Sequence, residues 1–322
     1  MQSNMIAETK KGKISSVWLE CLLFIALFLI LEIAKSIFTT VPLIIEITKT
    51  NIFDVVSSSV INFDDIHKAV LDVMSSQSVV ITMLFSCTVT IFGVIFYCRK
   101  IQKRSCASIG IVKKGAVKNY LMGILLGAVL LIAIYFVLFI CGVARDIRYD
   151  GFNYLIPLFF FGFLIQSASE ELLVRGYFMN SIAARSNIPV AVILNSIVFM
   201  VLHLLNPGIT IISMANIFIF GLLFSMLFLL TENIWLISGM HFFWNFASGC
   251  ILGSNVSGMK TKSLFYIPLT GDKLFAGGAF GIEGSVVTTI IGTVFSIVLI
   301  AFFVMRKRKT RQQFGGQNFD DL

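Results

Sequence analysis

The apolar residues of this chain form long unbroken runs, unlike the one-sided or alternating patterns of soluble domains. A helix that crosses a bilayer needs about 20 mostly apolar residues. Eight runs reach or approach that length, and they cover residues 17–34, 77–98, 119–142, 152–174, 188–205, 209–230, 233–252 and 284–305. The pattern predicts an all-α fold, a polytopic membrane helical bundle of about eight transmembrane helices.

The composition excludes a soluble protein. Of the 322 residues, 57% are hydrophobic and only 13% are charged, which is more apolar surface than a soluble domain can cover. The net charge of +8 therefore indicates basic loops beside anionic lipid and not a nucleic-acid partner. The six cysteines show no metal-binding spacing.

The basic residues predict an orientation. Eight spans put both ends of the chain on one side of the membrane. Sixteen lysines and arginines fall on that side and eight on the other, with Arg175 left out of the count. The side richer in positive charge is normally cytoplasmic, so both termini are expected in the cytoplasm. The C-terminus carries no prenylation or organelle-retention signal, which favours the plasma membrane of a bacterium.

The chain divides into four parts by charge and hydropathy. They are a cytoplasmic N-terminal tail (1–16), N-terminal transmembrane helices and loops (17–150), a transmembrane core with the candidate chemistry (151–305) and a basic, disordered C-terminal tail (306–322). Two long outer loops are expected, at 35–76 and 253–283. We interpret His67, Asp64 and Asp65 in the first as solvated, and the glycines of the second as suited to turns or close backbone approach.

Glu170 and Glu171 are adjacent carboxylates inside an apolar run, with Arg175 one helical turn after Glu171. A charge at bilayer depth is costly, so an intramembrane carboxylate indicates function. On a helix Glu171 can pair with Arg175, and Glu170 points about 100° away. The arrangement predicts one carboxylate held by the arginine and another available as a base. A plain Glu–Arg pair at a helix end is an equally weighted alternative.

Two of the three histidines also lie in apolar runs. His203 follows Phe199 by one turn, and His241 precedes Asn245 by one turn. A neutral imidazole can exchange a proton or bind a metal, and an asparagine amide can donate to an oxyanion. Taken alone, His203 is explained as a helix cap, and His241 with Asn245 as hydrogen-bonding partners between helices.

Together, Glu-Glu-x-x-x-Arg, Phe-x-x-x-His and His-x-x-x-Asn, in this order on separate apolar helices, resemble the CPBP family of intramembrane proteases. That family includes the CAAX prenyl endopeptidases and bacterial relatives linked to bacteriocin processing or self-immunity (Abi-type). The resemblance covers about residues 150–252. It implies that Glu170 and His203 activate a water, that His241 and Asn245 stabilise the oxyanion, and that Arg175 holds Glu171.

The resemblance leaves the cofactor open. Glu170, His203 and His241 could supply three ligands to Zn²⁺ with a water in the fourth position. The sequence lacks a His-Glu-x-x-His motif, and a glutamate can activate water without a metal. We slightly favour a site with no obligatory metal.

The predicted spans raise a problem of depth. In straight, upright helices over 152–174 and 188–205, Glu170 and His203 would differ in depth by roughly 15–20 Å. Catalysis would require tilted spans, or a sunken break near residues 186–189. We therefore expect a cavity there, open to the cytoplasm or sideways to lipid.

The expected function is an intramembrane endopeptidase acting on a membrane-associated peptide or protein. A non-proteolytic membrane scaffold, or an immunity or regulatory protein that binds a membrane partner, is the main alternative. A transporter that relays protons is a third, which lacks an inverted repeat to support it.

Overall fold

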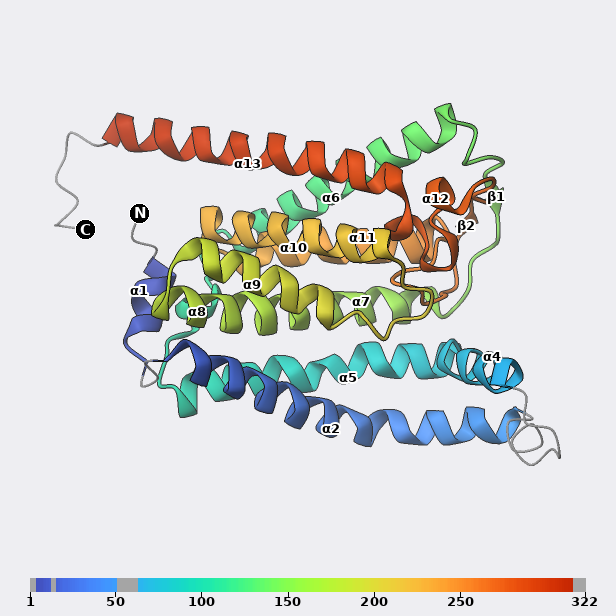
Figure 1. Ribbon diagram of the computed structural model, residues 1–322, viewed down its shortest axis with the longest axis horizontal. Coiled ribbons are helices and arrows are strands. Elements are labelled where there is room, and N and C mark those ends of the chain that lie inside the picture. The colour runs from blue at the N-terminus through green and yellow to red at the C-terminus, as the bar shows by residue number, and fades with distance from the viewer. Residues whose placement is uncertain (1–3, 13–15, 51–62, 315–322) are drawn as a thin grey trace.

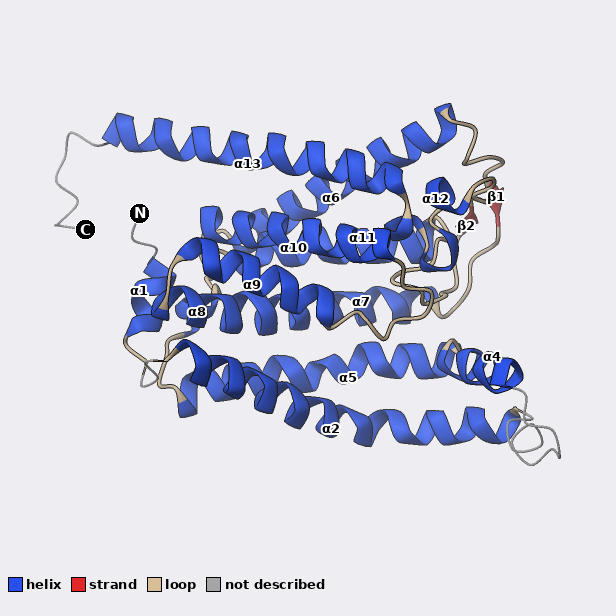
Figure 2. Ribbon diagram, viewed as in Figure 1, coloured by secondary structure: helices blue, strands red, loops and turns tan. Residues whose placement is uncertain are grey.

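The computed structural model describes residues 4–12, 16–50 and 63–314. Most of this part of the chain is helical, and its strands are one antiparallel pair of two residues each (Figure 2). The prediction of an all-α membrane bundle is confirmed.

The α-helices are α1 (Asn4–Lys10), α2 (Val17–Lys49), α4 (Phe63–Met74), α5 (Gln77–Phe96), α6 (Ala116–Ile140), α7 (Ile156–Glu171), α8 (Asn180–Arg185), α9 (Ile188–Val201), α10 (Ile211–Thr231), α11 (Ile234–Phe246), α12 (Lys273–Ala276) and α13 (Val286–Phe314). Three wider π-helical segments extend them, η1 (Tyr97–Ile101), η3 (Leu172–Met179) and η4 (Ala247–Ile251). Strands β1 (Arg148–Tyr149) and β2 (Phe265–Tyr266) pair antiparallel.

Each of the eight predicted runs contains a helix. Within the described residues, five helices are long and apolar enough to cross a membrane, namely Val17–Lys49, Gln77–Ile101, Ala116–Ile140, Ile156–Arg185 and Ile211–Thr231. Shorter apolar helices cover Ile188–Val201 and Val286–Phe302. The protein is therefore a multi-pass membrane protein.

The predicted outer loop at 35–76 is wrong over most of its length. Helix α2 continues to Lys49, and α4 begins at Phe63; residues 51–62 lie outside the described part of the chain. The polar residues of α2 suggested a helix end, but Glu32 and Lys35 pair with each other. Asp64, Asp65 and His67 belong to a helix and not to a loop.

The predicted end of the fourth span at residue 174 is also wrong. Helix α7 continues through η3 and α8 as one 30-residue helix, Ile156–Arg185. Its polar second half suggested a helix end, but Arg175 and Asn180 are fully buried inside the bundle. The tail predicted to be disordered over 306–322 is helical as far as Phe314, and residues 315–322 lie outside the described part.

Close packing fixes α11 against α6. A Cβ on Gly123 would lie 2.0 Å from the carbonyl oxygen of Leu236, and one on Gly239 would lie 2.3 Å from that of Tyr120. Only glycine permits such an approach, and small residues let membrane helices pack tightly. The helix that carries His241 and Asn245 is therefore held rigidly.

Helices α2 and α5 form a layer along one side of the bundle, and α13 runs along the opposite side (Figure 1). Helix α1 and the end of α13 lie at the same end of the molecule, away from β1 and β2. The segment 253–283 closes the β1–β2 end as a cap. Its glycines do allow close approach, because a Cβ on Gly258 would lie 1.9 Å from the carbonyl oxygen of Pro207.

Candidate active site

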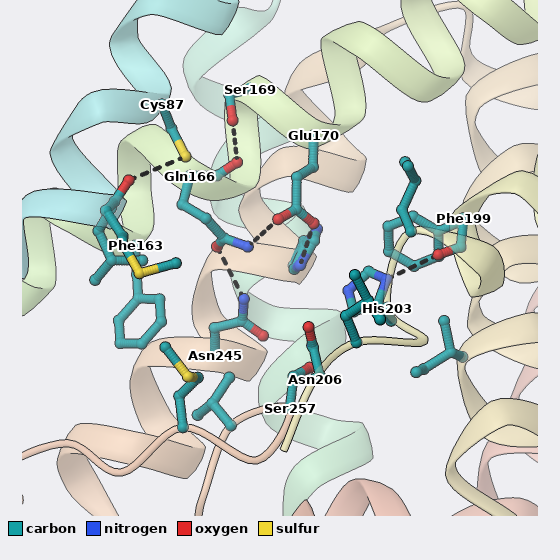
Figure 3. Close-up of a pocket in the computed structure, with 18 of the residues that line it drawn as sticks. Cys87, Phe163, Gln166, Ser169, Glu170, Phe199, His203, Asn206, Asn245 and Ser257 are labelled. Atoms are coloured by element: carbon teal, nitrogen blue, oxygen red, sulfur yellow. Dashed lines mark hydrogen bonds and ion pairs between the residues drawn. The ribbon is translucent and has the colours of Figure 1, made fainter. Parts of the chain in front are cut away.

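The four residues predicted to carry the chemistry line one cavity of about 930 Å³. Glu170 comes from α7, His203 from the turn after α9, and His241 and Asn245 from α11. Figure 3 shows Glu170, His203 and Asn245 around the same space. The expected cavity is misplaced: residues 186–189 do not line it, and it lies further along the two helices that they connect. Three separate segments of the chain supply the four predicted side chains.

The depth problem disappears because the helix with Glu170 is longer than predicted. Glu170 precedes Arg185, the end of α8, by 15 residues, and His203 follows Ile188, the start of α9, by 15. At about 1.5 Å per residue, each lies roughly 22 Å from the connection between the two helices. Two antiparallel helices joined by a short turn thus bring both residues to the same depth.

Glu171 and Arg175 form a fully buried ion pair. Nη1 of Arg175 donates to Oε1 of Glu171 over 3.0 Å, and both side chains are 0% exposed. The guanidinium carbon lies 4.0 Å from the centre of the Phe199 ring and 5.6 Å from that of Phe224. Aromatic faces attract a cation, so Phe199 helps to hold the arginine that holds Glu171.

Glu171 also orients His241. Nδ1 of His241 lies 2.8 Å from Oε1 of Glu171. A carboxylate that already receives a hydrogen bond from Arg175 can only accept, so His241 donates from Nδ1. Its Nε2 then faces Glu170, with Oε2 at 3.8 Å.

Glu170 points into the cavity, away from Glu171, as the helical spacing predicts. Its side chain is 29% exposed. Oε1 accepts a hydrogen bond from Nε2 of Gln166, and Oε1 of Gln166 accepts one from Nδ2 of Asn245 over 3.0 Å (Figure 3). Oε2 of Glu170 has no hydrogen-bond partner in the described part of the chain. That oxygen can accept a proton.

Phe199 fixes the tautomer of His203. Nδ1 of His203 lies 2.7 Å from the carbonyl oxygen of Phe199 (Figure 3). A carbonyl oxygen only accepts, so Nδ1 carries the hydrogen and Nε2 keeps a lone pair. Nε2 of His203 can therefore accept a hydrogen bond.

Sequence reasoning missed two residues of the site. Gln166 precedes Glu170 by one helical turn, a spacing that could have identified it. Glu283 of the cap is buried, and it accepts hydrogen bonds from Nε1 of Trp244 over 2.7 Å and from the amide of Ser257 over 2.7 Å. No local signal in the sequence indicated that Glu283 ties the cap to α11.

The geometry gives no ready-made metal site. Over the described residues, no group of three or more His, Cys, Asp or Glu side chains is placed to hold a metal ion. His203 and His241 each use Nδ1 for a hydrogen bond, to a carbonyl and a carboxylate. These hydrogen bonds leave Nε2 of both imidazoles free, as in a metal-ligating histidine, so Glu170, His203 and His241 are the residues that would hold Zn²⁺ and supply a metal-activated water. The steps proposed below use the side chains alone.

The fold and the cavity define a multi-pass helical membrane protein with an intramembrane set of carboxylate, imidazole and amide groups. Residues 152–247 match the family model described as Type II CAAX prenyl endopeptidase Rce1-like. This match confirms the resemblance of the core to the CPBP family of intramembrane proteases. The comparison with curated proteins and that with solved structures each found no match.

Proposed function

We propose that the protein is an intramembrane endopeptidase that hydrolyses a peptide bond in a membrane-associated protein or peptide. One observation carries the proposal: Glu170, His203 and the pair His241 and Asn245 come from three separate segments of the chain and line a single cavity. A chance set of structural polar groups has no reason to converge on one space. The family match over residues 152–247 supports the same reaction class.

The arrangement suggests a division of labour in the attack. The oxygen of a water forms a bond to the carbonyl carbon, and Oε2 of Glu170 takes the proton that the water loses. Nε2 of His203 accepts a hydrogen bond from the second hydrogen of the water, which aligns the water for attack. Gln166 donates to Oε1 of Glu170, which leaves Oε2 directed at the reaction.

Asn245 and His241 face the opposite side of the reacting carbonyl in this scheme. One hydrogen of the Asn245 amide is used on Gln166, and the other is available to the oxyanion. His241 donates from Nε2 once it has bound a second proton from solvent, and the Glu170 carboxylate, 3.8 Å from Nε2, balances that charge before it takes the proton of the water. The proton held by Glu170 then passes to the leaving nitrogen as the C–N bond breaks.

The test compares peptides and new protein N-termini from host cells that carry wild-type protein, Glu170→Ala or Glu232→Gln at equal membrane abundance. Glu232 ends α10 and does not line the cavity, so its variant is the control. Fragments present with wild type and the control, and absent with Glu170→Ala, support proteolysis and name the substrate. Identical fragments, with the host phenotype intact in Glu170→Ala, would favour a non-proteolytic scaffold or immunity protein.

We further propose that the protein lies in a bacterial plasma membrane with the α1 end in the cytoplasm, and that it acts in bacteriocin or pheromone processing or in self-immunity. The basic side chains at the α1 end support this orientation. Cys141 is exposed at the other end of α6. A membrane-impermeant maleimide should therefore label Cys141 in intact cells, and labelling of Cys106 alone would reverse the orientation.

A further inference from the structure

Helix α2 presents a polar face to the cavity, although it lies outside the segment that matches the family model. Glu32, Lys35, Ser36 and Thr39 all line the cavity. Their spacing of three, four and seven residues places them on one side of a helix. The rest of α2 carries many lipid-exposed apolar side chains, so the polar face is directed at the site.

Lys35 lies in the interior of α2, and its side chain faces the cavity. It follows Val17 by 18 residues and precedes Lys49 by 14, so the nearer helix end is about 21 Å away. The side chain lines the cavity and is only 18% exposed. A largely buried cation calls for an anionic partner.

The partner in the structure is weakly bound. Nζ of Lys35 lies 2.8 Å from Oε1 of Glu32, one turn earlier on the same helix, and Glu32 is 42% exposed. Pairs of this spacing with one accessible member contribute little. Lys49 and Glu46 form the same kind of pair over 3.0 Å, outside the cavity. Another carboxylate can therefore take the place of Glu32 on Lys35.

Lys35 also lines the same cavity as the proposed base, Glu170. Arg175 is committed to Glu171 and does not line the cavity. Among the described residues of the lining, Lys35 is the one lysine or arginine. An anion that enters beside the candidate base thus has a single cation to bind.

We propose that Lys35 binds a carboxylate of the substrate and so sets the position of the peptide relative to Glu170, while Glu32 holds the ammonium group when no substrate is present. The carboxylate is either the C-terminus of the peptide or an Asp or Glu side chain. This inference rests on the proposed function only in assuming that the cavity receives a peptide. Lys35 is a specificity-determining residue, and it takes no part in the proton transfers.

The test measures binding without cleavage. Purified Glu170→Gln protein in lipid nanodiscs is immobilised and offered a peptide library from digested bacterial membrane proteins, either untreated or with all carboxylates converted to methyl esters. We expect at least about tenfold stronger retention of the untreated peptides, as for a hydrogen bond between charged groups. Adding Lys35→Met should remove this preference, and Lys35→Arg or the matched control Lys49→Met should keep it.

Synthetic copies of retained peptides identify the source of the carboxylate. Loss of retention on amidation of the C-terminus assigns the C-terminal carboxylate, and loss on changing one Glu to Gln assigns a side chain. Equal retention of both libraries, retention of neither, or a preference that survives Lys35→Met would overturn the proposal. Cleavage by the wild-type protein is scored separately, so failure of the Lys35 site and failure of the protease proposal give different results.

Discussion

Gln166 donates a hydrogen bond from its side-chain amide to Oε1 of Glu170, one turn further along α7. The carbonyl oxygen of the same side chain accepts from Asn245 of α11 over 3.0 Å. One glutamine therefore links the proposed base to the proposed oxyanion donor. It sets the separation of two groups that would act on opposite sides of the reacting carbonyl.

Gln166→Met should lower the rate of peptide hydrolysis by roughly 10- to 100-fold, because both neighbours lose the partner that orients them. Methionine keeps the length of the side chain, so folding should be little affected. The measurement is the turnover rate of protein reconstituted in lipid, with thermal unfolding as the control for folding. A variant with wild-type turnover would exclude a positioning role for Gln166.

Hydropathy and motif spacing were enough to predict the helical bundle and the residues that meet in the cavity. Each apolar run contains a helix, because a segment in lipid must satisfy its own backbone hydrogen bonds. The different directions of the Glu170 and Glu171 side chains followed from helical geometry alone. These features depend on local sequence, which is why they could be predicted.

The ends of two helices could not be predicted in the same way. Arg175 and Asn180 resemble a cytoplasmic helix end in sequence, but tertiary partners satisfy them inside the bundle. Lys35 starts the predicted loop at 35–76, but it lies on a helix and faces a cavity. Polar residues end a hydropathic run, and only the packing of other helices shows whether they also end the span. The role of Glu283 likewise depends on contacts distant in sequence.

Arg175→Met should destabilise the fold by about 3–5 kcal/mol, because it leaves the Glu171 charge in the core without its cation and with only the hydrogen bond from His241. The double variant Glu171→Gln with Arg175→Met should lose less stability than Arg175→Met alone, since it removes the stranded charge. Unfolding in detergent micelles measures both. Equal losses in the single and double variants would show that the ion pair is not the source of the effect.

Gly258→Ala should reduce activity roughly 10- to 100-fold by moving the cap against the turn that carries His203. Gly258 has a φ of +83°, and a Cβ there would lie 1.9 Å from the carbonyl oxygen of Pro207. Gly271 is the matched control, with a φ of +94° and no atom within 4 Å of its Cβ position. Both substitutions carry a backbone penalty of about 1–2 kcal/mol. A difference in turnover between the two variants therefore reports the clash with Pro207 alone.

Chelators should leave hydrolysis unchanged, since the proposed mechanism routes no step through a metal. The purified protein is assayed in lipid before and after treatment with EDTA and 1,10-phenanthroline. Constant turnover is the expected result. Loss of turnover that added Zn²⁺ restores would instead point to Glu170 and the free Nε2 atoms of His203 and His241 as ligands.

The central claim is that Glu170 activates water against a peptide bond inside the membrane. The most direct measurement is cleavage by reconstituted wild-type protein in H₂¹⁸O, with the substrate identified by the N-terminal comparison, followed by mass spectrometry of both products. The account predicts one ¹⁸O atom in the new C-terminal carboxylate, and no product with Glu170→Gln at equal folded amount. Product formation by Glu170→Gln at the wild-type rate would contradict it.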